Sequence, residues 1–281
     1  RSSWKIIEVE HSSPSGFEIQ YKEYVKSIPC WDIYHRFKSW FYYQKSLSNE
    51  KRNRRFIYGI CDKYVMLAEG LISQCQKYGH IDDNSKFEII GNPISMDNSS
   101  ATLSLKKKEC LFVGRLDSMK GIDKLMRIWA IVESRVKDWT LVIVGDGIMM
   151  PEVKNAIAHY RLEHVCLEGF QADVKRYYQT ASIFCMCSIY EGFPMVLPEA
   201  MGFGVVPIVF NSFAALDDIL VDGEDGVKVT AFDEEAYSEN LIAMISDDVR
   251  LKMMQSKALE NSRKFCVSSI LEKWDELFKN L

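Results

Sequence analysis

The sequence has 281 residues, which is enough for about two domains and a sizeable buried core. Its 35 Lys and Arg residues against 39 Asp and Glu residues give a formal net charge of −4, which argues against general nucleic-acid binding. No apolar run approaches the roughly 18 residues that a membrane-spanning helix needs. The eight cysteines are scattered without a C-x-x-C pair, so we expect reduced thiols of a cytosolic protein rather than a disulfide framework.

The N-terminal third begins with a strand-like run, residues 4–9, followed by a loop that contains His11. Residues 31–58 then carry aromatic side chains at spacings of three and four among many Lys and Arg residues, which predicts a helix. Two interpretations stay open for this helix. It either packs on a sheet with a solvated basic face, or it forms a membrane-surface patch for a lipid-linked acceptor.

A strand–helix–strand series follows this helix. Residues 60–67 read as a strand, 69–77 as a helix, and 87–94 as a short strand that ends in Asn92-Pro93. Residues 95–105 are rich in Ser, Asn and Asp, and we expect them to be a linker.

The next apolar run, Cys110–Val113, predicts a strand that ends in a turn at Gly114. A helix is then expected to open at Lys120-Gly121 and to reach about Val136. Arg115 and Lys120 therefore share one strand-to-helix loop, and two cations beside free helix N–H groups suit a diphosphate. The simpler interpretation is a pair of exposed cations on a solvated loop.

Strands at 140–145 and 165–170 alternate with helices up to about residue 180. The turn Asp146-Gly147 is not a dinucleotide-binding fingerprint, because position 150 is Met where the third glycine would be. This alternation continues to residue 230 and predicts a doubly wound parallel domain.

The stretch Ser188–Gly204 lies between two apolar strands, 182–187 and 205–210, and forms a βαβ unit with them. Pro198 is expected at the first helical position, and Glu199 in the first turn, where the helix dipole favours a carboxylate. Glu191 and Glu199 thus bracket a loop at the carboxyl ends of the strands, where ligands bind in open α/β sheets. The simpler interpretation is an ordinary βαβ turn with two solvated carboxylates.

After this unit we expect a turn at 221–226, an edge strand at 227–229 and two amphipathic helices at 234–246 and 248–264. A last helix, 268–278, carries apolar residues at helical spacing.

The spacing of Glu191 and Glu199 resembles the E-x7-E motif of family 4 retaining glycosyltransferases, and the flanking words Tyr190–Pro194 and Pro198–Met201 are also typical of that family. The resemblance implies the GT-B fold, an α/β architecture of two Rossmann-like domains, the C-terminal one a doubly wound parallel sheet. Its expected domains are 1–95, the incomplete acceptor-side domain; 96–262, the nucleotide-sugar-binding domain; and 263–281, a helix that crosses back onto the N-terminal domain.

The resemblance covers roughly 4–281, and the family's first strand and Gly-rich loop are absent from the sequence. We therefore expect that the gene product is longer or that this chain is a fragment, which would transfer sugar poorly by itself.

The same resemblance assigns roles to individual residues. Arg115 and Lys120 would grip the donor diphosphate, Glu199 would take the ribose hydroxyls, and Glu191 with the backbone of 192–197 would hold the donor sugar and phosphates. His11 matches a histidine near the reacting sugar, and the turn at Phe170 would lie beside the nucleobase. The implied catalytic residues are His11, Arg115, Lys120 and Glu191, and the implied donor-binding residues are Gly114, Arg115, Lys120, Phe170, Glu191, Gly192, Phe193, Pro194, Met195, Val196, Leu197 and Glu199.

The implied function is retaining transfer of a hexosyl or N-acetylhexosaminyl group from a nucleotide-sugar, a UDP-sugar by expectation, in the synthesis of cell-surface polysaccharide or lipopolysaccharide. The acceptor would be a saccharide or a lipid-linked saccharide, reached from the cytoplasm or from the inner face of the membrane.

Neither a cofactor nor a metal is expected, because the chain has no Asp-x-Asp and no His-Glu-x-x-His. Two alternatives remain: a nucleotide-sugar-binding module without catalysis, and a GT-B sugar-nucleotide epimerase, which lacks the Gly-Arg-Leu…Lys-Gly pattern. Asn211–Leu216 replaces a Gly-rich loop of the family, so the identity of the donor stays open.

Overall fold

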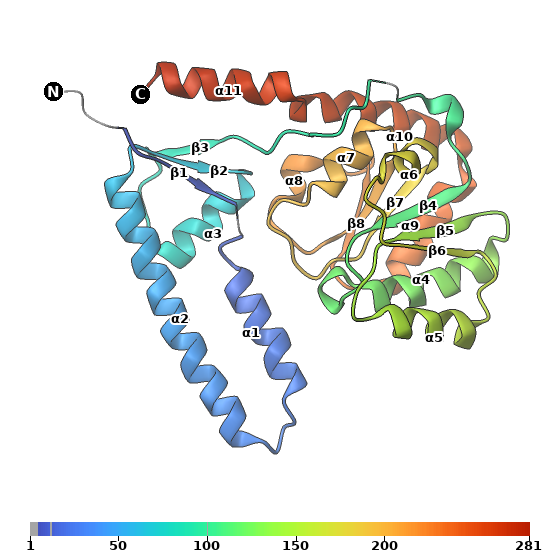
Figure 1. The fold of residues 1–281 in the computed structure, drawn as a ribbon, viewed down its shortest axis with the longest axis horizontal. Helices are drawn as coiled ribbons and strands as arrows, with labels where there is room; N and C mark the ends of the chain where they lie inside the picture. The colour runs from blue at the N-terminus through green and yellow to red at the C-terminus, as the bar shows by residue number, and fades with distance from the viewer. Residues whose placement is uncertain (1–4, 12, 100) are drawn as a thin grey trace.

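The computed structural model describes residues 5–11, 13–99 and 101–281, which form two parallel β-sheets with helices around them (Figure 1). The smaller sheet has the order β1-β2-β3. Its strands are β1 (Ile7–Glu10), β2 (Lys63–Met66) and β3 (Phe87–Ile89). All pairs in this sheet are parallel, with Val9 opposite Val65 and Val65 opposite Glu88.

Two long helices connect β1 to β2 and form a hairpin that projects away from both sheets (Figure 1). These are α1 (Gly16–Ser27) and α2 (Ile33–Ile60), and α3 (Gly70–Gly79) follows β2. The Asp32 carboxylate caps α2 by accepting a hydrogen bond from His35 N at 3.1 Å. The Arg36 guanidinium donates to the carbonyl of Ile28 at 3.2 Å, which fixes the turn between the two helices.

The larger sheet is fully parallel in the order β6-β5-β4-β7-β8-β9. Its strands are β4 (Glu109–Val113), β5 (Thr140–Val144), β6 (Val165–Gly169), β7 (Ile183–Met186), β8 (Val206–Asn211) and β9 (Val227–Thr230). The order reverses between β4 and β7, which is the topological switch point where doubly wound sheets bind ligands.

Helices cover both faces of this sheet. They are α4 (Ile122–Arg135), α5 (Met150–Tyr160), α6 (Lys175–Thr180), α7 (Val196–Gly202), α8 (Leu216–Ile219), α9 (Glu234–Ser246) and α10 (Asp248–Asn261). Because successive strand residues face opposite sides, Leu111 packs in the core beneath α7, while Cys110 and Phe112 pack in the core beneath α4. The two parallel sheets, each with its own helices, correspond to the two Rossmann-like domains of the GT-B fold that we expected from the sequence.

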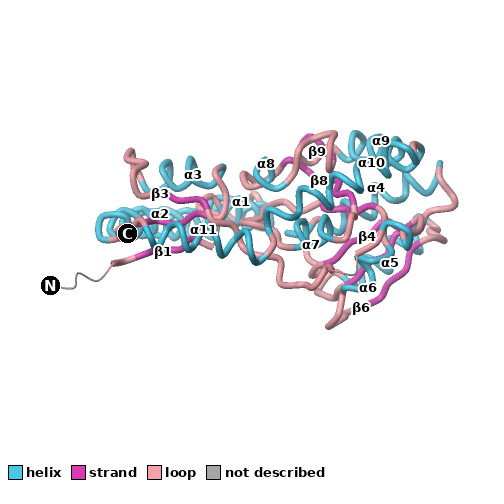
Figure 2. The backbone as a smooth tube through the Cα atoms, turned by 90° about the horizontal axis from the view of Figure 1, so that it is seen from above, coloured by secondary structure: helices cyan, strands magenta, loops and turns pink. Residues whose placement is uncertain are grey.

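The last helix, α11 (Val267–Lys279), leaves the larger sheet and packs on the smaller one (Figure 2). Ile270 and Leu277 are buried with Val65 of β2 and Ile90. A further contact between the two halves comes from the Asp218 carboxylate, which accepts from the Glu69 and Gly70 amides at 3.0 and 3.2 Å. The domain boundaries that we expected at residues 95 and 262 stay predictions.

Two local predictions about helix starts were wrong. Lys120 does not open α4; it ends a 3₁₀ turn, Ser118–Lys120, because Gly121 takes a left-handed conformation with φ of 65°. Pro198 is the third residue of α7 and not the first, because Val196 already has helical geometry. Glu199 still lies in the first turn, as predicted.

All eight cysteines are free thiols, which agrees with the expectation of no disulfide framework. Within 5–11, 13–99 and 101–281 no helix combines the length and the apolar character needed to cross a bilayer.

The packing of α11 leads to a first prediction. Ile270→Ala removes a side chain that is buried against the smaller sheet, so we expect the free energy of unfolding to fall by about 2–5 kcal/mol. Leu271→Ala is the matched control, because Leu271 is exposed on the same helix and should change it by less than about 0.5 kcal/mol. Urea titrations of both variants measure the difference, and equal midpoints would show that α11 does not hold the smaller sheet.

Candidate functional site

The switch point brings together the loops that follow β4 and β7. Ile189 N donates to Met119 O at 2.8 Å, so a backbone hydrogen bond joins the two loops. A side chain at Gly121 would place its Cβ 2.0 Å from the carbonyl oxygen of Cys187, so this position accepts only glycine. Close backbone approach therefore sets the distance between the two predicted binding loops.

An ion pair connects the same two loops. Lys120 Nζ lies 2.6 Å from Glu191 Oε1, and the two side chains are 27% and 13% exposed. The Asp117 carboxylate accepts from Lys120 N at 3.0 Å and holds the turn from which the lysine extends. The structure thus places two of the predicted site residues in direct contact, with the ammonium group still reachable from solvent.

Arg115 lies on the same loop but points into solvent. Its side chain is 78% exposed, and its guanidinium pairs with Asp117 at 3.1 Å. Gly114, one residue earlier, lies against β5, because a side chain at Gly145 would meet the Gly114 carbonyl oxygen at 1.8 Å. The loop is therefore tightly packed at its base and open at Arg115.

Glu199 occupies the first turn of α7, where its carboxylate faces the N-terminal end of the helix dipole. It accepts a hydrogen bond from Tyr178 OH at 3.3 Å. Burial raises the pKa of the Glu199 carboxyl above its ordinary value, although the Tyr178 hydrogen bond acts in the opposite direction. A partly buried carboxylate with one fixed donor retains acceptor capacity for ligand hydroxyls.

The residues between these two glutamates divide into two groups. Phe193, Pro194 and Leu197 have buried side chains, and Phe193 packs edge-on against Phe265 with ring centroids 5.8 Å apart. Gly192, Met195 and Val196 are only partly buried. Because the Phe193 and Leu197 side chains belong to the core, any contact of these two residues with a ligand would come from the backbone.

Phe170 follows β6, and its ring is 76% exposed. The strand end before it is tied to β5, because Gly145 N donates to Gly169 O at 2.8 Å. The ends of β4, β5 and β6 are therefore joined side by side, with Phe170 at the far side from Glu191. An exposed ring in this position is available for contact with a planar base.

His11 lies in the loop after β1 and is exposed. The loop reaches the stretch Ser188–Gly204, because Tyr190 OH donates to Ser13 O at 3.2 Å. A Cβ on Gly16 would lie 2.1 Å from the same Tyr190 oxygen, so the start of α1 also packs closely there. The structure thus brings the His11 loop to the residue next to Glu191, across the junction of the two domains.

No group of three or more His, Cys, Asp or Glu side chains in the described ranges could hold a metal ion. That sugar transfer needs no metal ion stays a prediction. Measuring the transfer rate in excess EDTA would test it.

Sequence reasoning missed three residues that organise this site. Tyr178 bonds to Glu199, Tyr190 joins the two domains, and Ser212 Oγ donates to Ser188 O at 2.7 Å. Tyr190 directly precedes Glu191 and begins the word Tyr190–Pro194, so the sequence did contain a signal that pointed to it. The spacing of the other two residues gives no such indication.

The comparison with known families identifies the chain. Residues 96–265 match the family model "Glycosyl transferases group 1". The chain belongs to this family. It is 30% identical over 215 residues to an uncharacterized glycosyltransferase of Haemophilus influenzae, covering 76% of this chain and 60% of that protein.

A second relative is a Campylobacter jejuni enzyme named GalNAc-α-(1→4)-GalNAc-α-(1→3)-diNAcBac-PP-undecaprenol α-1,4-N-acetyl-D-galactosaminyltransferase. The identity is 27%, over 80% of this chain and 62% of that one. The amylovoran biosynthesis glycosyltransferase AmsD of Erwinia amylovora is 28% identical, over 79% and 63% respectively. The chain therefore spans about three fifths of the length of these relatives.

Solved structures show the same fold. Anabaena Alr3699/HepE, determined in complex with UDP, matches 99% of this chain and 72% of its own with a TM-score of 0.77 and 17% identity. The lipopolysaccharide outer core galactosyltransferase WaaB matches 84% of this chain and 66% of its own, with a TM-score of 0.69 and 21% identity.

The buried carboxylate leads to a second prediction. A carboxyl whose pKa is higher in the folded state than its ordinary 4.5 binds more protons folded than unfolded, so stability falls as the pH rises from 4.5 through the raised pKa. Glu199→Gln should therefore raise the melting temperature of the nucleotide-free protein at neutral pH. This gain should shrink as the pH falls from the raised pKa toward 4.5.

The same variant should weaken nucleotide binding tenfold or more, because charge-assisted hydrogen bonds are worth about 1.5–3 kcal/mol each. Calorimetry with UDP measures the affinity. Glu152→Gln, an exposed first-turn glutamate of α5, is the control and should change neither quantity. Unchanged UDP affinity in Glu199→Gln would remove Glu199 from the site.

Proposed function

We propose that this protein transfers a hexosyl or N-acetylhexosaminyl group from a UDP-sugar to a saccharide or lipid-linked saccharide, with retention of anomeric configuration. The observation that carries the proposal is the Lys120–Glu191 ion pair at the switch point, with Glu199 in the first turn of the helix that follows the same loop. A family match over residues 96–265 supports it, as do the group-transfer activities named for the relatives.

The geometry supports a donor that extends from Glu199 to Lys120. Glu199 would accept the ribose hydroxyls, while the Lys120 ammonium beside the loop that leads into α7 would bind the diphosphate. A bound diphosphate would then compete with Glu191 for the Lys120 ammonium. Glu191 would be released toward the sugar, which is how this residue could serve the donor sugar and still pair with lysine in the empty site.

The transfer step would use the positive charges of Lys120 and Arg115 to stabilise the leaving diphosphate. As the bond between the anomeric carbon and the phosphate oxygen breaks, negative charge grows on the diphosphate, and Lys120 and Arg115 would stabilise it. The acceptor oxygen would bond to the anomeric carbon on the same face, which gives retention. Its proton would pass to the leaving phosphate oxygen, so atoms and charge balance without a further reactant.

The outer face of α2 supports contact with a membrane that carries the acceptor. Successive helical residues lie about 100° apart, so Ile33, Phe37, Trp40 and Phe41 share the side opposite α1, and all four are exposed. Residues 31–58 hold seven Lys and Arg residues against two acidic ones, in a chain whose overall charge is negative. Aromatic side chains beside basic ones are typical of helices that lie on an anionic lipid surface.

The proposed diphosphate contact leads to a third prediction. Arg115→Ala and Lys120→Ala should each reduce kcat by about a hundredfold, since one preorganised charge partner is worth about 10²–10³ in rate. Binding of uridine should barely change, because the nucleoside has no phosphate. Lys107→Ala is the control, because Lys107 is exposed at the amino end of β4, on the opposite edge of the sheet.

Steady-state kinetics of the natural full-length protein measure these effects. Near-normal kcat in both alanine variants would mean that the two cations only stabilise the loop, and the proposed transfer mechanism would be wrong.

The outer face of α2 leads to a fourth prediction. The double variant Phe37→Ser/Trp40→Ser should reduce binding to vesicles of phosphatidylcholine and phosphatidylglycerol tenfold or more, because each buried aromatic side chain contributes about 1.5–3 kcal/mol. Ile148→Ser removes an even more exposed apolar side chain from the larger domain and should leave binding unchanged. Vesicle flotation measures the bound fraction, and equal binding of all three proteins would exclude this face as the membrane contact.

A further inference from the structure

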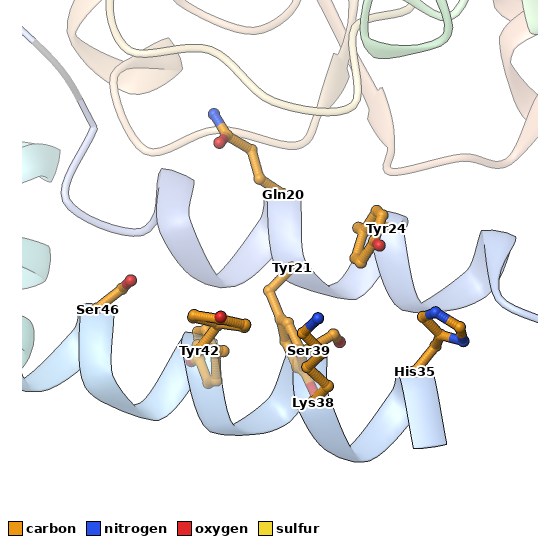
Figure 3. A pocket seen from close by; sticks show the side chains of 9 residues that line it. Gln20, Tyr21, Tyr24, His35, Lys38, Ser39, Tyr42 and Ser46 are labelled. Atoms are coloured by element: carbon orange, nitrogen blue, oxygen red, sulfur yellow. The ribbon is translucent and has the colours of Figure 1, made fainter. Parts of the chain in front are cut away.

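A cavity of about 390 Å³ lies between α1 and α2, outside the donor site. We call it the tyrosine pocket, because Tyr21 and Tyr24 of α1 and Tyr42 and Tyr43 of α2 line it (Figure 3). Its volume falls within the range of about 300–1,000 Å³ that small-molecule sites occupy. Neither the switch-point loops nor the exposed outer face of α2 contributes to its lining, so neither donor binding nor membrane contact accounts for this pocket.

The pocket combines flat aromatic surface with many hydroxyl groups. Tyr21 and Tyr43 stack with ring centroids 4.2 Å apart and an interplanar angle of 11°, which makes a rigid aromatic wall. Each phenol can donate and accept a hydrogen bond while its ring stays apolar. A pyranose has the matching surface, because its C–H groups pack on aromatic faces and its hydroxyls hydrogen-bond at the rim.

One polar atom in the lining lacks a partner. Ser39 Oγ is buried, and it makes no hydrogen bond to any residue in the described part of the chain. Leaving a buried hydroxyl unpaired is unfavourable, and a ligand hydroxyl would satisfy it. A polyprenyl or acyl chain would leave this hydroxyl unpaired and would also cover the phenols, so the lining favours a sugar over a lipid tail.

The tyrosine pocket shares one lining residue with a second cavity that reaches the stretch Ser188–Gly204. Tyr21 also lines a second cavity of about 440 Å³, whose other walls include Lys22, Ile189 and Ser212. Ile189 lies two residues before Glu191, and Ser212 follows β8 at the carboxyl edge of the sheet. A chain of sugars with its reacting end near Glu191 could therefore continue past Tyr21 into the tyrosine pocket.

We propose that the tyrosine pocket binds a pyranose of the acceptor saccharide that lies one or more sugars away from the reacting end. The proposal rests on the proposed function, since only transfer defines an acceptor. It assigns the α1–α2 hairpin a part in acceptor selection, because a saccharide lacking the distal sugar would lose these contacts. The inner face of α2 would bind the distal sugar, while the outer face would contact lipid.

The test measures binding of methyl pyranosides of glucose, galactose, N-acetylglucosamine and N-acetylgalactosamine by saturation-transfer NMR. At least one should bind, and Tyr42→Ala should weaken it roughly tenfold through loss of the aromatic edge. Ser39→Ala should weaken it about two- to tenfold through loss of one hydrogen bond. Neither variant should unfold, because Tyr42 is largely exposed and the Ser39 hydroxyl is unpaired.

Phe56→Ala is the control on the same helix, since Phe56 is exposed and does not line the pocket. It should leave pyranoside binding unchanged. The inference is overturned if no pyranoside binds the wild-type chain, if Tyr42→Ala binds as well as wild type, or if farnesyl phosphate occupies the pocket instead. UDP calorimetry on the same samples separates the two proposals: normal UDP binding without pyranoside binding removes only the pocket, and absent UDP binding removes the donor site.

Discussion

The close backbone approach of the loops after β4 and β7, across which Lys120 pairs with Glu191, is the constraint on which the rest of the site depends, because the strand order reverses there. The backbone contacts of Met119 with Ile189 hold the same loops together independently of charge. The loops can therefore keep their spacing while the lysine exchanges one anion for another. A diphosphate is an anion of the right kind, since it carries more charge than the carboxylate that it would displace.

The same loops depend on the smaller sheet for their position. Tyr190 bonds to the loop after β1, Asp218 caps α3, and α11 returns to bury Ile270 beside Val65. Core residues from both sheets form one continuous cluster, which includes Met66 and Leu71 from the smaller half and Leu197 from α7. The loops after β4 and β7, the His11 loop and the base of the α1–α2 hairpin are consequently parts of one packed body.

Much of this organisation could be predicted from the sequence, because it follows from local pattern. Apolar runs predicted the strands of the larger sheet in chain order. The Glu191–Glu199 spacing predicts a site at their carboxyl ends. Two helix starts were wrong, since left-handed Gly121 and the early start of α7 depend on neighbours that no local pattern reports. Tyr178 and the tyrosine pocket could not be found either, because their partners are distant in sequence and only packing brings them together. The roles of individual residues stay predictions.

The central claim is that a nucleoside diphosphate binds at the switch point and takes Lys120 from Glu191. A crystal structure of the protein soaked with UDP tests it most directly. The account predicts density for the ribose beside Glu199, for the diphosphate beside Lys120 and the start of α7, and a broken Lys120–Glu191 contact. UDP bound elsewhere, or bound here with the ion pair intact at its present 2.6 Å, would contradict it.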